Sequence, residues 1–236
     1  MSGLGFALIA AAGNLAGAAA LVRHERRSMA LIEGCVAFGA GFMLAVAMLE
    51  MLPEAIGRGG PEAALYVFGG YLGVHLAQHV LVPHFHFGEE THRLSPAVGF
   101  SVLAGLLLHT FFDGVAIASG LAVSPAFGLL LFLAVFLHKL PEGLTMASVM
   151  LAGGQSGARA LGAAAALGVA TVAGVLLTEW IEPLAAHGLA LSAGVTLYVA
   201  ASNLVPEFQA KRGWALPVAF FGGAVAFFVA RTLLGI

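Results

Sequence analysis

Eight apolar stretches of about 20 residues each follow one another along the chain, separated by short breaks with glycine, proline or charge. About 20 apolar residues is the length that a helix needs to cross a bilayer. The stretches cover roughly 3–22, 30–53, 62–82, 97–120, 125–152, 159–181, 186–208 and 214–234. Composition decides against a soluble core, because 60% of the 236 residues are hydrophobic and only 9% are charged. Soluble domains carry about 25% charged residues. We therefore predict an all-α polytopic membrane protein with about eight transmembrane helices in a lipid bilayer.

The breaks between the stretches leave no room for a separate soluble domain, so residues 1–236 are expected to form one transmembrane domain. The longest polar connection, 83–95, contains His84, His86 and His92. Lys and Arg mark cytoplasmic loops, and the odd-numbered connections hold most of the 10 Lys and Arg residues. We therefore predict that both termini lie outside and that the 83–95 loop is cytoplasmic. Its histidines form either a metal-collecting site or an ordinary solvated loop.

Charge and cysteine content narrow the partners. The formal net charge of -2 suggests no nucleic-acid partner. The single cysteine, Cys35, allows no internal disulfide and no thiolate cage for copper(I). Small residues are abundant, and small-residue faces permit a homodimer without requiring one.

Two His-carboxylate pairs lie in the fourth and fifth apolar stretches. His109 precedes Asp113 by one helical turn, and His138 precedes Glu142 in the same way. Residues at i and i+4 share one face of a helix. The connection around 123–125 is short, so the two helices should form an antiparallel hairpin. Packed face to face, they would present two imidazoles and two carboxylates to one point, which suits a zinc-type or iron-type ion.

Charged groups inside these stretches need a reason. Asp113, Lys139 and Glu142 would each cost about 2.5–3.5 kcal/mol at the bilayer centre if left uncompensated. They are therefore expected to face a protein-lined or watery cavity, and to be functional. A buried polar network that pins the two helices is the alternative, and it explains the duplicated motif less well. Pro141 should kink the fifth helix beside His138, although membrane helices often tolerate proline.

A short internal repeat connects the second and seventh stretches. Glu50 lies three residues before Pro53, and Asn203 lies three residues before Pro206. With the predicted topology one helix runs outward and the other inward, as in a transporter with inverted repeats. This predicts a 3+2+3 arrangement in which helices four and five carry the metal site. The alternative is that a Pro-Glu pair is simply a common helix end at an interface.

The segment from His138 to Gly143, preceded by His109-x-x-x-Asp113, resembles the ZIP (Zrt-/Irt-like) family of divalent-metal transporters, and the bacterial GufA-like branch in particular. The resemblance implies a secondary transporter that moves Zn²⁺, or a related Fe²⁺, Mn²⁺, Cd²⁺ or Co²⁺ ion, into the cytoplasm. It also implies elevator-like sliding of one helix bundle past another, and a location in the bacterial inner membrane. The metal is then cargo, and no cofactor is expected.

The resemblance assigns roles to individual positions. It implies that the metal ligands are His109, Asp113, His138 and Glu142. Met43 resembles a thioether-donating position on the second helix, and Glu182 resembles a glutamate that serves a second metal in some members. Simple packing for Met43 and an interfacial helix end for Glu182 are the alternatives. Glu50 is a candidate entrance carboxylate at the outer end of the second helix.

Two positions depart from the family pattern. Thr110 stands where an asparagine is frequent, and Lys139 stands where a carboxylate is frequent. Both are second-metal positions, so we expect no complete second site. Our hypothesis is that Lys139 pairs with Asp113, Glu142 or Glu182 and replaces the charge of the missing metal.

Two rival functions also use intramembrane histidines and carboxylates. An intramembrane zinc hydrolase would be signalled by His-Glu-x-x-His, whereas this chain reads His138-Lys139-Leu140-Pro141-Glu142. We therefore do not expect an enzyme. A metal-binding sensor that moves no ion stays open on the sequence.

Overall fold

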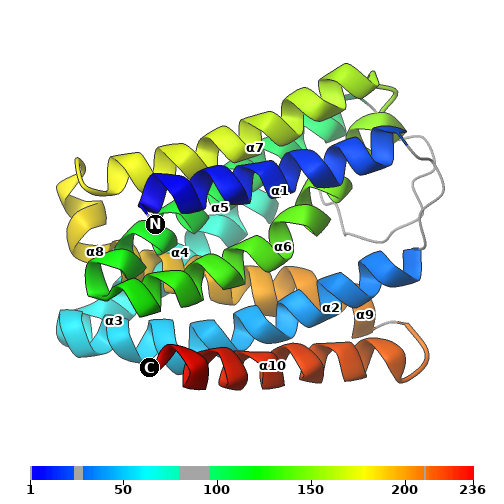
Figure 1. Ribbon diagram of the computed structural model, residues 1–236. Helices are drawn as coiled ribbons and strands as arrows, with labels where there is room; N and C mark the ends of the chain where they lie inside the picture. The colour runs from blue at the N-terminus through cyan, green and yellow to red at the C-terminus, as the bar shows by residue number, and fades with distance from the viewer. Residues whose placement is uncertain (1, 24–28, 80–95, 210) are drawn as a thin grey trace.

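The computed structural model describes residues 2–23, 29–79, 96–209 and 211–236, and the regular structure in these ranges is helical throughout (Figure 1). The helices are α1 (Gly3–Arg23), α2 (Met29–Val46), α3 (Leu52–Gly59), α4 (Ala63–His79), α5 (Pro96–Val123), α6 (Pro125–Ala152), α7 (Gly157–Thr178), α8 (Glu182–Tyr198), α9 (Val205–Gln209) and α10 (Ala215–Leu234). A first π-helical segment (Ala47–Met51) joins α2 to α3, and a second (Val199–Leu204) joins α8 to α9. A 3-10 turn, Gly60–Glu62, precedes α4.

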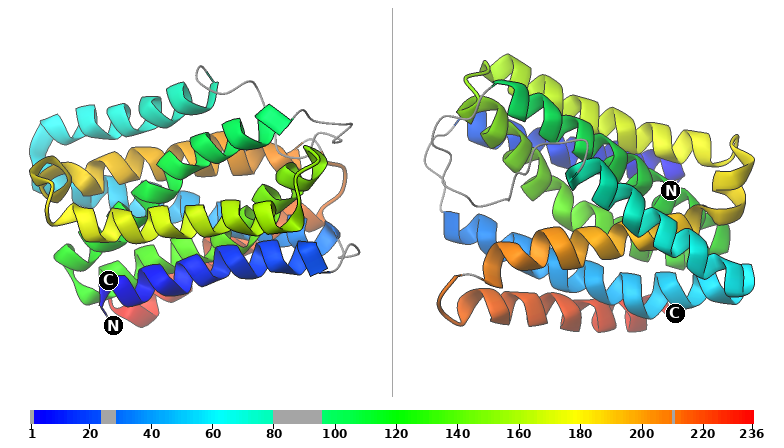
Figure 2. Two further views of the ribbon diagram at one scale, coloured as in Figure 1. Left: turned by 90° about the horizontal axis from the view of Figure 1, so that it is seen from above. Right: turned by 180° about the vertical axis from the view of Figure 1, so that it is seen from behind.

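Within the described ranges, 7 helical runs are long and apolar enough to cross a membrane. One of them, Glu33–Gln78, has 46 residues and reverses at Gly60, whose φ is +62° (Figure 2). It therefore contributes two antiparallel helices, and the eight predicted stretches are all present. The second stretch is longer than predicted: Pro53 does not end it, because Pro53 sits in the first turn of α3, where a missing N–H is tolerated.

Contacts between distant helices support the same count of eight. Glu33 and Glu50 of the second stretch pair with Lys211 and Arg231, in that order, so α2 and α10 run parallel. Because successive crossings alternate in direction, parallel packing of the second and eighth stretches requires an odd number of crossings between them, and the third to seventh stretches supply five. The chain is thus a multi-pass membrane protein built from alternating antiparallel helices.

The helices form two groups (Figure 1). In the first group, α1, α5, α6 and α7 all pack on one another. In the second group, α2 pairs with α10 and α4 pairs with α8. The groups meet mainly through contacts of α5 with α8 and of α2 with α6. Most of α6 is buried at the centre, whereas α10 exposes most of its surface.

Close helix contacts confirm the inverted repeat and give its register. A Cβ added to Gly41 would collide with the carbonyl oxygen of Phe220. A Cβ added to Gly194 would collide in the same way with the carbonyl of Val67. The same sequence offset separates Gly41 from Gly194 and Val67 from Phe220, so the α2–α10 contact of one half is repeated as the α8–α4 contact of the other. Small residues allow these close backbone approaches.

The polar side chains near the two prolines obey the same offset. Glu50, in the first π-helical segment, is paired with Arg231 of α10 at 2.6 Å. Its counterpart Asn203, in the second π-helical segment, donates to Gln78 of α4 at 2.9 Å. Since α2 and α8 run in opposite directions, the two pairs lie at opposite ends of the molecule. One end therefore carries an ion pair where the other carries a neutral amide pair.

Candidate metal centre

A tight hairpin between α5 and α6 brings the two His-carboxylate pairs to one depth. Ser124 caps α6 by accepting a hydrogen bond from the Phe127 N–H at 3.1 Å, and Pro125 occupies the first turn. Beside this turn the backbones of α5 and α6 come close, since a Cβ on Gly120 would lie 3.1 Å from Gly128 Cα. The helices then remain in contact along their length. The α6 helix continues through Pro141 without a break.

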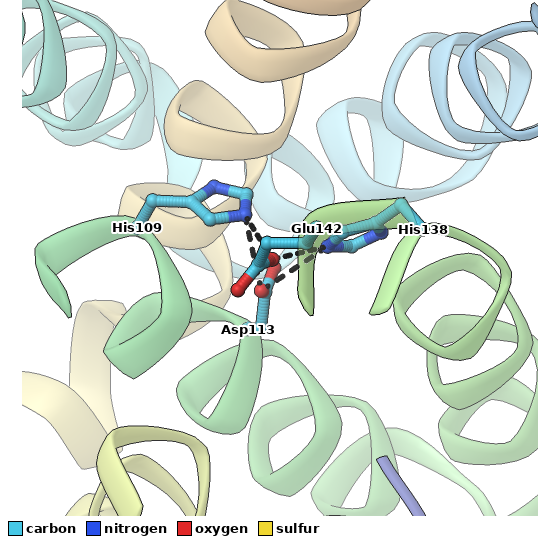
Figure 3. A group of neighbouring side chains, drawn as sticks. All are labelled: His109, Asp113, His138 and Glu142. Atoms are coloured by element: carbon cyan, nitrogen blue, oxygen red, sulfur yellow. Dashed lines mark hydrogen bonds and ion pairs between the residues drawn. The ribbon is translucent and has the colours of Figure 1, made fainter. Parts of the chain in front are cut away.

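His109 and Asp113 from α5 meet His138 and Glu142 from α6 (Figure 3). One candidate ligand atom from each of the four lies within 4.8 Å of all the others, and all four residues are buried. Asp113 Oδ2 is 3.3 Å from His109 Nε2 and 3.2 Å from His138 Nε2. Glu142 Oε2 is 3.4 Å and 3.7 Å from the same two nitrogens.

These separations suit a tetrahedral ion. Zinc bonds of about 2.0–2.1 Å place neighbouring ligand atoms roughly 3.4 Å apart. The four His-carboxylate separations scatter around that value, so the side chains are close to a coordinating arrangement.

The hydrogen bond of His138 to the backbone selects the tautomer that a metal needs. His138 Nδ1 lies 2.9 Å from the Ala134 carbonyl oxygen. A carbonyl only accepts, so Nδ1 must carry the proton and Nε2 directs its lone pair toward the carboxylates. His109 also directs Nε2 inward, and its buried Nδ1 has no hydrogen-bond partner in the part of the chain that the structure describes.

Lys139 supplies the positive charge that this arrangement requires. Its Nζ lies 2.6 Å from Asp113 Oδ2 and 2.9 Å from Glu142 Oε2, and its side chain is fully buried. Pairing with Asp113 and Glu142 is thus confirmed, while the third predicted partner, Glu182, begins α8 as an exposed residue. The ammonium holds the same two oxygens that a metal would use.

Two neutral side chains reach the other oxygen of Glu142. Thr110 Oγ1 donates to Glu142 Oε1 at 2.9 Å. Asn14 Nδ2 of α1 lies 3.5 Å from the same oxygen, a long hydrogen bond. Sequence reasoning missed Asn14, although a buried amide between Gly13 and Gly17 in an apolar stretch was a usable signal.

The other predicted residues lie apart from this cluster or outside the description. Met43 is buried in the hydrophobic core with Phe42 and Val46. Glu50 is buried and paired with Arg231. Their roles in a metal pathway stay predictions. Three further histidines, in the 83–95 loop, fall outside the described residues, namely His84, His86 and His92.

Comparison with known families fits this geometry. The family model described as ZIP zinc transporter matches residues 84–230, a range that contains both His-carboxylate pairs. This chain belongs to the ZIP zinc transporter family. The GufA-like branch stays a prediction.

Curated relatives of this ZIP-family chain include the zinc transporter ZupT of Shigella dysenteriae serotype 1 and that of Shigella flexneri serotype 5b. Each is 29% identical over 122 residues, covering 46% of this chain and 46% of the relative. The match thus spans about half the length of these relatives.

Proposed function

We propose that this chain moves Zn²⁺, or a related divalent transition-metal ion, across the membrane by binding it between His109, Asp113, His138 and Glu142. The observation that carries the proposal is the meeting of these four buried ligand atoms within 4.8 Å, in the middle of two apolar helices. Family membership supports it, as do relatives named as zinc transporters.

The charges of the cluster suit a dication. Two carboxylates neutralise a doubly charged ion, so the loaded centre is less costly to bury than two bare carboxylates. When no dication is present, the ammonium of Lys139 takes over part of that compensation. The ion and the ammonium therefore compete for Asp113 Oδ2 and Glu142 Oε2.

The division into two helix groups supports an elevator-like movement. Every side chain of the centre, including Asn14, comes from α1, α5 or α6, all in the first group. That group can therefore carry a complete site past α2, α4, α8 and α10 without breaking its ligand set. The distribution of Lys and Arg supports outside termini. Uptake into the cytoplasm across a bacterial inner membrane is what the resemblance to the ZIP family implies.

Zinc flux into proteoliposomes tests the proposal. His138→Ala removes one ligand and should reduce flux to that of protein-free vesicles. His187→Ala is the matched control, because His187 lies in α8 and stacks on Tyr66 away from the cluster. Equal flux for the His138 variant and the native protein, at equal incorporation, would refute the assignment. Binding without flux in the native protein would instead indicate a sensor, and cleavage of a substrate would indicate a hydrolase.

A further inference from the structure

Asn14 combines a fully buried side chain with an incomplete set of hydrogen bonds. Its amide nitrogen is 3.5 Å from Glu142 Oε1. Its amide oxygen is also buried and has no hydrogen-bond partner in the described ranges. Buried acceptors are normally paired, so an orphaned oxygen beside a charged cluster calls for a reason.

Close packing fixes Asn14 at this place. A Cβ on Gly143 would lie 2.6 Å from the Asn14 carbonyl carbon, and a Cβ on Gly13 would lie 3.2 Å from Lys139 Cβ. The backbone of α1 therefore rests directly on the turn of α6 that carries Lys139 and Glu142. Consequently, the Cα of Asn14 cannot move away from Lys139 without separating the two helices.

The inverted repeat relates the contact of α1 with α6 to a contact of α7 with α5, and the two differ in their polar side chains. Gly114 packs on the Thr171 carbonyl as Gly143 packs on that of Asn14, so Thr171 is the counterpart of Asn14. Gly143 of α6 follows Gly114 of α5 by 29 residues, and the same offset makes Thr110 the counterpart of Lys139. Thr171 donates its hydroxyl to the Leu167 carbonyl of its own helix at 3.4 Å. Of these two related helix contacts, the α1–α6 contact, which contains Lys139, is thus the one whose amide oxygen has no hydrogen-bond partner in the described ranges.

We infer that Asn14 is a further positioning residue, whose amide oxygen receives the Lys139 ammonium when a dication takes the carboxylates. The inference rests on the proposed function. A dication bound to Asp113 Oδ2 and Glu142 Oε2 displaces Nζ from 2.6 Å and 2.9 Å contacts. A displaced ammonium in a dry interior needs another acceptor. The Asn14 oxygen is neutral, so it can hold the ammonium without competing for the dication.

A double-mutant cycle on Zn²⁺ affinity, measured by calorimetry on the full chain in detergent, tests this inference. The four proteins are the native chain, Asn14→Leu, Lys139→Met and the double variant. We expect Asn14→Leu to weaken binding roughly tenfold or more in the native background, the usual weight of a hydrogen bond to a charged group. We expect a change of less than about twofold in the Lys139→Met background, where no ammonium needs an acceptor.

The cycle separates this inference from its alternatives. An equal loss in both backgrounds would show that Asn14 acts through Glu142 alone, and no loss in either would show that it does nothing; both results overturn the inference. Asn14→Ser, which keeps a hydroxyl acceptor, should restore part of the affinity and serves if the leucine variant does not fold. Absence of Zn²⁺ binding by the native chain would instead overturn the proposed function.

Discussion

Replacing Lys139 by glutamine should tighten zinc binding. The change leaves the two carboxylates of Asp113 and Glu142 without their cation, and their nearest ligand oxygens lie within 4.8 Å of each other. With an effective dielectric constant of about 20, two unit charges at that distance repel by roughly 3.5 kcal/mol. A bound dication relieves this repulsion and no longer has to displace an ammonium. The gain corresponds to an affinity increase of roughly three-hundredfold, since about 1.4 kcal/mol is a factor of ten.

Competition with a zinc chelator of known affinity, at fixed pH in detergent, measures this change. Lys211→Gln is the matched control. Lys211 pairs with Glu33 and not with a residue of the metal centre, so this variant should leave the zinc affinity unchanged. A flux measurement on the same Lys139 variant should show slower release of a more tightly held ion. Unchanged or weaker binding by Lys139→Gln would refute the idea that the ammonium and the dication compete for the same oxygens.

Three further predictions concern other parts of the structure. Lys139→Asp restores a carboxylate at the second-metal position, and anomalous scattering should then reveal a second ion; if none ever appears, the charge-replacement hypothesis is wrong. Gly143→Leu should lower stability by about 1–3 kcal/mol or more through overpacking, whereas Gly162→Leu, which has open space, should not lower the melting temperature. Arg231→Gln removes the partner of Glu50 and should lower stability by about 1 kcal/mol, because the arginine is half-exposed. The neutral variant Glu50→Gln leaves no buried carboxylate without its partner, so a larger loss of stability for Glu50→Gln than for Arg231→Gln would contradict this.

The centre could be predicted because its information is local. His109 with Asp113 and His138 with Glu142 each share a helix face by spacing alone, and a short connection makes their helices neighbours. The cost of burying Lys139 also required a partner carboxylate nearby. Local sequence did not determine which of the three candidate carboxylates pair with Lys139. Glu182 is excluded as a partner only by the structure, in which α8 begins at the surface.

Hydropathy and spacing by themselves determined the membrane class, the eight crossings and the convergence of the two His-carboxylate pairs, since each depends on neighbours along one helix. The tertiary structure decided the register of the inverted repeat, the pairing of Glu50 with Arg231, and the place of Asn14 against Glu142. Those features depend on where a glycine of one helix meets the backbone of another far away in sequence. Such contacts fix the register of two packed helices to within one residue. No single stretch of sequence contains both residues of such a contact.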